Sequence, residues 1–473
     1  MRTTHPYIFR LRGFTRLLRF LPLLILPTLS GCKKFLNVLP VTDVSDQVTI
    51  VDATSSETAV RGVYRALAGG YSASGGTGTG SYYGGLYETF GYLGGDDIVW
   101  TGSQSVIQQF ISHQIVADND NLESVWTGIY QTINQANQVI AKVPLVVDPT
   151  FAAGQQNQLT GEGYFIRALS YFDLARVWGG VPITLTPTTS ATQKNGIARS
   201  TLAQTWAQVL SDLNTADSLM ELPASQNPVR ANKETAWALK ARYYLYQQNW
   251  AEAESYATQV LADVTNYQLL TPFNTWFQPA SAVATKESVF ELSYNATYLN
   301  GSRTDWQPPA TGGTRQWAPG DSIASLLTNP TIGGGRSAFV AQTNTGLWYG
   351  NLFYRSPATD PSYIIRIAEV YLIRAEARAQ QGELSGALTD LNAVRTRAGL
   401  ANSTAVTQSD ILQAIYNENR VEFALEPHRW FDLVRWGQAQ SVLGITDPNM
   451  LLFPIPSQEI TLSNGVLTQN PGY

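Results

Sequence analysis

The sequence predicts a mainly α-helical protein that carries one long irregular insertion. Three observations lead to this prediction. About ten segments place apolar residues at helical spacing, two helical segments share a repeated pattern, and roughly a hundred residues between them are rich in Gly, Pro, Thr and Asn. A composition of 44% hydrophobic and 11% aromatic residues is typical of a globular protein.

The first 31 residues have the features of an export signal. Several arginines precede an apolar run from Phe20 to Leu29, and the small residues Ser30 and Gly31 stand directly before Cys32. The apolar run is about half the ~20 residues that a membrane span needs, which favours a signal peptide over a transmembrane helix. This pattern resembles a bacterial lipobox. We therefore expect Cys32, the only cysteine in the chain, to become a lipid-carrying N-terminus.

The charge of the chain excludes one class of partner. The formal charge is −5, and the signal contributes five arginines without any acid, so the remaining chain carries about −10. Proteins that bind nucleic acid or adhere electrostatically to anionic lipid need basic patches. We therefore expect no nucleic-acid partner.

The predicted helices follow one another along the chain. A first helix at about 55–67 is followed by a Gly-rich loop at 69–85 and an aromatic-rich ordered segment at 86–100. The strongest periodicity lies in 157–178, where the helix ends at the Gly179–Pro182 break. The other helices are predicted at 122–143, 201–219, 233–248, 250–263, 363–381, 384–398, 408–425 and 428–436.

A weak internal repeat links two distant parts of the chain. Segments 241–260 and 375–394 each consist of an Ala-rich helix, a Gln-Gln-Asn or Gln-Gln-Gly turn and a second Ala-containing helix. Small residues allow paired helices to approach closely, as in tetratricopeptide repeats. Two copies so far apart predict a helical scaffold with a large insertion, and not an open solenoid.

The insertion, residues 264–360, contains many aromatic residues. Disordered segments are poor in aromatics, so an ordered and functional region is favoured. One strand is predicted, at 288–294. Tryptophan and tyrosine rings in such loops can stack on the apolar faces of sugar rings, although many of the rings must belong to the core.

Enzyme signatures are sparse. Of the three histidines, His113 and His428 follow the signal, and neither has the spacing of a metal site or a catalytic triad. Asp96 and Asp97 are adjacent and do not form a facing pair of the kind that glycosidases use. The charged segment 417–437 is interpreted as a partly buried ion-pair network. We expect no catalytic residue, no metal and no cofactor.

Several segments, in order along most of the chain, resemble the SusD/RagB family of outer-membrane nutrient-uptake lipoproteins of the Bacteroidetes type. The resemblance implies a SusD-like fold, with tetratricopeptide-type helix pairs and an irregular region that binds the ligand. The matching segments are CKKFL at 32–36, GEGYFIRALSYFDLARVWGGVP at 161–182, AWALKARYYLYQQNWAEA at 236–253, IRIAEVYLIRAEARA at 365–379, residues 418–437, LFPIPSQEI at 452–460 and QNPGY at 469–473.

With this resemblance, residues 1–31 are a lipoprotein signal peptide and 32–473 form a single domain. Its scaffold spans about 55–263 and 361–440, and the insertion about 264–360. The family implies a non-enzymatic protein anchored by lipid in the outer membrane and facing the cell exterior. Such a protein captures oligosaccharides and passes them to a SusC-like TonB-dependent transporter.

The resemblance places the ligand site only by region. Four rings are candidates for an exposed aromatic arc, and two polar side chains could bond sugar hydroxyls. Peptide capture by the same architecture is an alternative, which a deep closed cavity would support. A surface-anchored glycoside hydrolase or a purely structural scaffold is less favoured. The candidate residues are Trp100, Tyr298, Trp306 and Trp317, with Asp97 and Arg315 as hydrogen-bonding partners.

Overall fold

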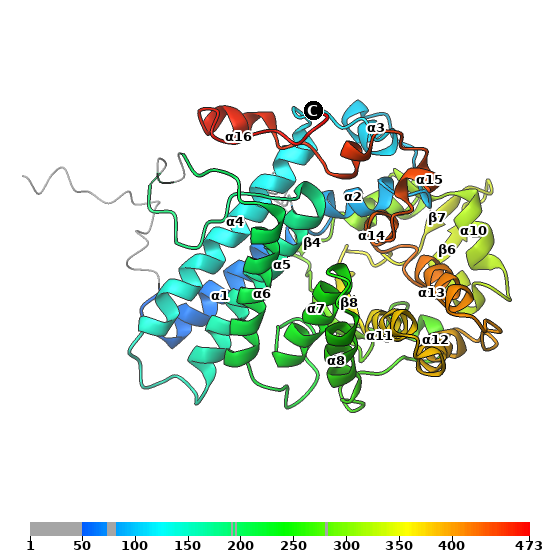
Figure 1. Cartoon of the computed structure of the whole chain (residues 1–473), viewed down its shortest axis with the longest axis horizontal. Helices are drawn as coiled ribbons and strands as arrows, with labels where there is room; N and C mark the ends of the chain where they lie inside the picture. The colour runs from blue at the N-terminus through cyan, green and yellow to red at the C-terminus, as the bar shows by residue number, and fades with distance from the viewer. Residues whose placement is uncertain (1–49, 73–81, 191–192, 194–195, 280–281) are drawn as a thin grey trace, which may run out of the picture. The chain divides into compact units, whose positions relative to one another are not determined.

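Helices account for most of the chain that the computed structural model describes, namely residues 50–72, 82–190, 193, 196–279 and 282–473 (Figure 1). Cys32 and the predicted signal at 1–31 lie outside these residues. None of the helices in the described ranges combines the length and the apolarity that crossing a bilayer requires. The long helices are α1 (Ala53–Ala68), α4 (Asp120–Lys142), α5 (Gln155–Trp178), α6 (Leu202–Leu219), α7 (Lys233–Tyr246), α8 (Trp250–Leu261), α11 (Ile367–Gln381), α12 (Leu384–Arg397) and α13 (Gln408–Glu422).

The prediction of a mainly α-helical fold is confirmed, and each predicted helix is present within a few residues of its expected ends. One boundary was wrong. The helix expected at 363–381 begins only at Ile367, because Ser362–Arg366 form strand β8, which pairs with β3 (Ser288–Leu292). Every residue of β8 is buried, and a short apolar run that is buried on both faces has the same pattern in a strand as in a helix.

The helix ends follow from local chemistry. Asp52 caps α1 by accepting a hydrogen bond from the Ser55 amide, and the Ser55 hydroxyl in turn accepts one from the Asp52 amide. Thr201 caps α6 in the same way. Helix α5 ends at Gly179, whose φ of 78° is readily adopted only by glycine, as the predicted break requires.

The long helices pack side by side in pairs, and α5 lies between α4 and α6 (Figure 1). Side chains of α5 are buried around most of its circumference. Two glycines on α5 allow this close packing. A Cβ on Gly161 would lie 2.6 Å from the Met220 side chain, and one on Gly163 would lie 3.1 Å from Val139.

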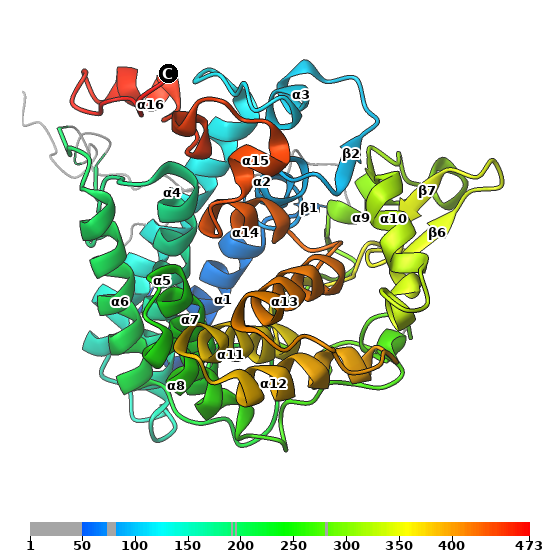
Figure 2. The same cartoon turned by 45° about the vertical axis from the view of Figure 1, so that its right-hand side comes forward.

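The predicted repeat corresponds to two adjoining helix pairs. Helices α7 and α8 form one pair, α11 and α12 form the other, and α8 packs directly on α11 although the insertion separates them in sequence (Figure 2). The Arg378 guanidinium of α11 bonds Glu254 of α8 at 2.7 Å. Arg374 of α11 bonds Asp390 of α12, also at 2.7 Å.

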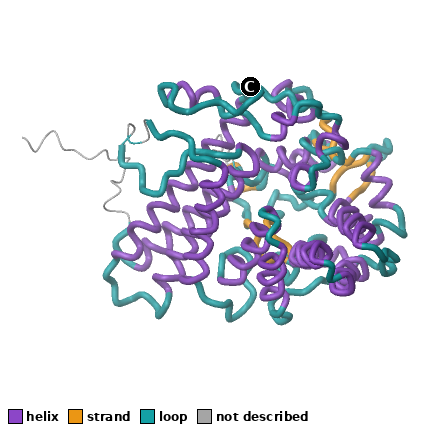
Figure 3. Tube along the Cα trace, viewed as in Figure 1, coloured by secondary structure: helices purple, strands orange, loops and turns teal. Residues whose placement is uncertain are grey.

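The insertion is built of short elements and loops, in contrast to the long helices (Figure 3). Strand β3 confirms the strand predicted at 288–294. The other elements between α8 and β8 are η2 (Phe273–Trp276), β4 (Tyr298–Leu299), α9 (Ser302–Trp306), η3 (Pro309–Thr311), β5 (Trp317–Pro319), α10 (Asp321–Thr328), η4 (Gly334–Phe339), β6 (Val340–Gln342) and β7 (Trp348–Gly350).

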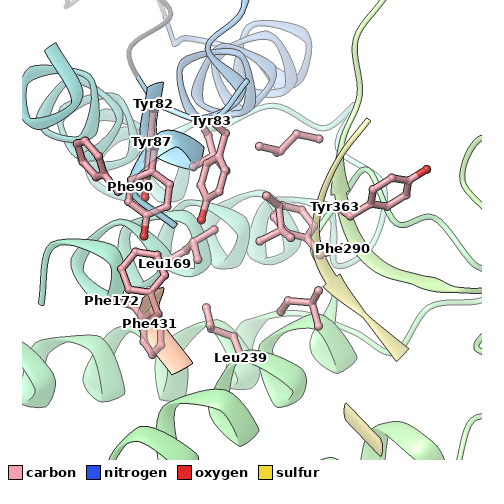
Figure 4. Packing of buried hydrophobic residues seen from close by; sticks show 14 of the residues in the cluster. Tyr82, Tyr83, Tyr87, Phe90, Leu169, Phe172, Leu239, Phe290, Tyr363 and Phe431 are labelled. Atoms are coloured by element: carbon pink, nitrogen blue, oxygen red, sulfur yellow. The ribbon is translucent and has the colours of Figure 1, made fainter. Parts of the chain in front are cut away.

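Aromatic side chains fill much of the core. Tyr82 and Tyr83, labelled in Figure 4, stack with their ring centroids 4.7 Å apart. Both hydroxyls donate to the Asp173 carboxylate of α5 at 2.7 Å. Tyr87, on helix α2 (Leu86–Leu93), lies edge-on to Tyr82 and stacks with Phe431 of α14 (Arg429–Arg435). These contacts join the N-terminal and C-terminal thirds of the chain.

A buried ion-pair network fastens the insertion to the repeat helices, which confirms the structural interpretation of segment 417–437. Glu422 of α13 accepts bonds from Arg336 of η4 and from Arg366, each at 2.8 Å, and also bonds Arg397. Arg397 and Arg366 also pair with Glu287. Burial would raise the pKa of Glu422, but the charges of the three arginines outweigh it and lower that pKa to about 2.

Candidate functional site

A short antiparallel ladder positions the most exposed of the predicted tryptophans. Strand β2 (Ile98–Trp100) pairs with β5 so that Trp100 lies directly opposite Trp317. The ladder extends by one more bond, in which the Thr101 amide donates to the Gln316 carbonyl at 2.8 Å. Opposed residues of a ladder direct their side chains to the same face, so the two indoles share one side of this sheet.

The indole of Trp100 lies over the backbone of the next loop. A Cβ on Gly102 would lie 2.2 Å from Cζ2 of the Trp100 ring, so only glycine leaves room for the ring in this position. Trp100 is partly exposed, and its side chain borders hollows on two sides. Gly102 thus fixes where the ring of Trp100 lies.

The first hollow, here the Trp100 pocket, has a volume of about 330 Å³. It contains an aromatic wall, several glycines and hydroxyl or amide side chains, the usual composition of a site for a small polar ligand. Its lining residues are Gly70, Gly84, Gly85, Leu86, Thr89, Trp100, Gln104, Val106, Ile107, Asn121, Gly301, Asp305, Gln316 and Trp317.

The second hollow, here the glutamine groove, begins on the other side of Trp100 and runs along helix α3 (Ser105–Ile111). Its lining is almost wholly uncharged and polar, so it offers both donors and acceptors without a net charge. It is formed by Trp100, Gly102, Ser103, Gln104, Ser105, Gln108, Gln109, Ser112 and Gln114.

Asp305, on α9, is the one ionisable side chain among the residues that line the Trp100 pocket. Within the described chain, no hydrogen-bond donor reaches its carboxylate. Burial, with a smaller effect from the nearby Glu88 carboxylate, raises the pKa of Asp305 to about 7. A carboxyl without a partner beside an aromatic wall can bond a hydroxyl group of a ligand. No sequence pattern around Asp305 had indicated this role.

Two of the predicted rings are core residues, so the expected arc of exposed rings is not present. Trp306 is 0% exposed and Trp317 is 2% exposed. Together with Tyr92 they form a cluster in which ring centroids lie 5.2 to 5.7 Å apart. Trp317 contributes to the pocket wall from within the core, whereas Trp306 does not line the pocket. Which of these rings are buried depends on how the loops pack against the rest of the protein. The aromatic content of the sequence alone could not show which rings would be exposed.

Asp97 is also placed differently from the expectation. It is 1% exposed, and its Oδ1 accepts bonds from Arg420 at 2.6 and 2.8 Å. Burial raises the pKa of Asp97 even though the arginine opposes that shift. Its carboxylate therefore serves an ion pair between the residue just before β2 and α13, and Asp97 lines neither hollow.

Tyr298 and Arg315 lie outside the lining of both hollows. Tyr298 is 41% exposed, and the Arg65 guanidinium lies 3.9 Å from its ring centroid, which covers one face. Nε of Arg315 donates to the Trp348 carbonyl at 2.7 Å. Contact of either residue with a ligand stays a prediction, as it does for Trp100.

The histidines and paired carboxylates occupy structural positions. Nε2 of His113 lies 2.9 Å from the Gly94 carbonyl, and the partly buried His428 stacks on the buried ring of Phe423. Burial lowers the pKa of His428 well below its usual value. The Asp96 carboxylate bonds Arg429 at 2.6 Å. Within the described ranges, no group of three or more His, Cys, Asp or Glu residues could hold a metal ion.

Other hollows fit a ligand site less well. A pocket of about 390 Å³ between α4, segment 182–197 and α16 (Ser457–Leu462) has Trp126 in its wall, but that ring is 2% exposed. A cavity of about 30 Å³ beside His428 and Arg242 has room for little more than one water molecule. Among these hollows, all within the described part of the chain, the Trp100 pocket is the one that combines a partly exposed indole with a carboxyl to which no described residue donates a hydrogen bond.

Two family models match this chain. The model described as "SusD family" matches residues 354–450, and the one described as "Starch-binding associating with outer membrane" matches residues 86–245. The second match includes β2, α3 and therefore the Trp100 side of the pocket.

Relatives match nearly end to end. SusD-like protein P38 of Formosa agariphila is 24% identical over 518 aligned residues, which cover 96% of this chain and 98% of the relative. Starch-binding protein SusD of Bacteroides thetaiotaomicron is 24% identical and covers 80% of this chain and 83% of its own length. The solved structure of a laminarin binding SusD-like protein superposes with a TM-score of 0.75 at 24% identity, over 89% of this chain and 99% of that one. The family models, the relatives and the shared fold agree, and the chain belongs to the SusD/RagB family.

Proposed function

We propose that this protein is a non-enzymatic lipoprotein of the outer-membrane surface that captures oligosaccharides and passes them to a SusC-like TonB-dependent transporter. One observation carries the ligand part of the proposal: the partly exposed Trp100 indole borders two hollows, one of which is lined mainly by Ser and Gln side chains, while the other combines apolar walls with a few hydroxyl and amide side chains. This combination of an aromatic ring and polar side chains matches a saccharide, because the faces of a sugar ring are apolar and its edges carry hydroxyls.

The energetics of this arrangement suit capture and release. At ~25 cal/mol per Å² of apolar surface removed from water, a tenfold gain in affinity, about 1.4 kcal/mol, requires a sugar to cover about 55 Å² of the ring. Hydrogen bonds in the glutamine groove add direction but little net energy, because water competes for the same groups. Such a site holds a ligand weakly enough to hand it on.

The relatives support the same function. One is named for starch binding and a structural neighbour for laminarin binding, and a matching family model is described as starch-binding and associated with the outer membrane. Non-enzymatic action is supported by the lining of the Trp100 pocket, where Asp305 is the only carboxylate, whereas glycosidases use two that face each other. The transporter partner and the lipid on Cys32 rest on the family resemblance.

The proposal is tested by titration calorimetry of the purified protein against neutral and acidic glycans and a peptide mixture, with product analysis after long incubation. We expect binding of at least one glycan class, no cleavage products and a roughly tenfold weaker affinity for Trp100→Ala. Binding of peptides alone would replace saccharides by peptides as the ligand, and the appearance of products would refute the non-enzymatic role.

A further inference from the structure

The charge inside the Trp100 pocket is set by one residue. Among the lining residues only Asp305 is ionisable, so no lysine or arginine contributes to the wall. Asp305 comes from α9, a short helix of the insertion, and faces the hollow together with Trp317 and Gln316.

The groups around Asp305 make its surroundings more negative. Glu88 of α2 is the ionisable neighbour that raises the pKa of Asp305, and it is buried. Burial also raises the pKa of Glu88 itself, and the hydrogen bonds that it accepts oppose that shift. Its carboxylate oxygens accept bonds from the hydroxyls of Ser302, at 2.7 Å, and Ser362, at 2.8 Å. Both donors are uncharged hydroxyl groups, so neither of these two hydrogen bonds neutralises a negative charge on Glu88.

The arginines close in sequence to the pocket are directed to other partners. Arg303, two residues before Asp305, donates to the Thr311 and Tyr354 carbonyls. Arg315 donates to the Trp348 carbonyl, and Arg65 lies over the Tyr298 ring and bonds the Gly69 carbonyl. Each of these three arginines therefore donates at least one hydrogen bond to a backbone carbonyl and not to the Asp305 carboxylate.

We propose that the Trp100 pocket selects uncharged saccharides over uronic-acid saccharides, and that Asp305 is the residue that sets this preference. The inference rests on the proposed function and narrows its substrate class. An ionised Asp305 accepts bonds from sugar hydroxyls, but it repels a sugar carboxylate that enters the same pocket.

The preference depends on pH in a definite direction. The Asp305 pKa lies at about 7, since burial and Glu88 disfavour its charged form. A bound uronate would raise that pKa further, so binding takes up a proton, and affinity for uronates falls as pH rises above 7. A neutral saccharide has no charge to repel, and its affinity should change less than about threefold between pH 6 and 8.

The test compares a neutral glucose hexasaccharide with a uronic-acid hexasaccharide by calorimetry at pH 6 and 8. The proteins are the wild type, Asp305→Asn and the control Glu252→Gln, which removes the same charge from an exposed position on α8. We expect the wild type and the control to bind the uronate at least tenfold more weakly than the neutral glycan at pH 8. In Asp305→Asn the difference should shrink below about threefold and lose its pH dependence.

Two results would overturn the inference: equal affinity of the wild type for both saccharides at pH 8, or unchanged discrimination in a folded Asp305→Asn. The pH series on the wild type gives an answer even if that variant does not fold. Binding of neither saccharide, with binding of peptides, would instead overturn the proposed function itself, so the two failures are distinguishable.

Discussion

Replacing Trp317 by alanine should destabilise the fold strongly, whereas the same change at Trp100 should chiefly weaken ligand binding. The two residues face each other across the β2–β5 ladder, but Trp317 is 2% exposed and Trp100 is partly exposed. Replacing each tryptophan by alanine therefore distinguishes a residue that stabilises the core from one that contacts the ligand.

The magnitude follows from burial. A buried tryptophan removes up to about 250 Å² from water, and at ~25 cal/mol per Å² this contributes about 6 kcal/mol, of which alanine retains a small part. The cluster with Tyr92 and Trp306 would also lose two ring contacts, at 5.2 and 5.7 Å. Measured losses for such truncations are about 3–5 kcal/mol, which we expect for Trp317→Ala. For Trp100→Ala we expect a smaller loss, about 1–2 kcal/mol, because its side chain is only partly buried.

Urea unfolding followed by far-ultraviolet circular dichroism measures both effects, and calorimetry with a neutral glycan measures binding of the folded fraction. Trp317→Phe, which keeps an aromatic ring in the core, should recover most of the stability and bind normally. Wild-type stability of Trp317→Ala together with lost binding would refute the assignment of this ring to the core.

Three further predictions concern other parts of the molecule. Gly102→Ala should displace the Trp100 ring and weaken glycan binding about tenfold with little change in the urea midpoint, because the new Cβ would lie 2.2 Å from that ring; unchanged affinity would contradict this. Glu422→Gln should lower the free energy of unfolding by about 3–5 kcal/mol, whereas Arg61→Gln at an exposed pair should change it by less than about 1 kcal/mol. Because the pKa of Glu422 is lowered to about 2, its contribution is complete above about pH 4.5 and is lost as pH falls toward 2, so the wild type should lose about 3 kcal/mol there that the variant does not lose. Cys32→Ala should release the protein from the membrane fraction, and full retention would refute lipid anchoring.

The long helices could be predicted because their signal is local. Amphipathic spacing and capping residues such as Asp52 act within a few residues of each other. Helix α2 was not predicted, because nearly all of its side chains are buried and it has no polar face. It also contains Gly91, where a Cβ would lie 2.4 Å from the Pro427 carbonyl. The residue that requires glycine at this position, Pro427, is more than 300 residues away in the chain, so the sequence around Gly91 could not show why glycine stands there.

The candidate site could be predicted only in part. The candidate rings included Trp100, which does lie at a pocket, but also Trp317 and, as a fourth, Trp306, both of which are buried in the core. Whether a loop ring is buried depends on which distant segment packs on it, as Tyr92 of α2 does on Trp306. Asp305 went unnoticed for the same reason, since its role depends on the hollow that other elements form around it.

The most direct test of saccharide capture is a crystal structure of the protein with the tightest-binding neutral oligosaccharide. We expect a sugar ring stacked on the Trp100 indole, hydroxyls within hydrogen-bonding distance of Asp305 and Gln104, and an intact glycosidic bond. A sugar bound instead between α4 and α16, with the Trp100 pocket empty at saturating ligand, would contradict the proposed site.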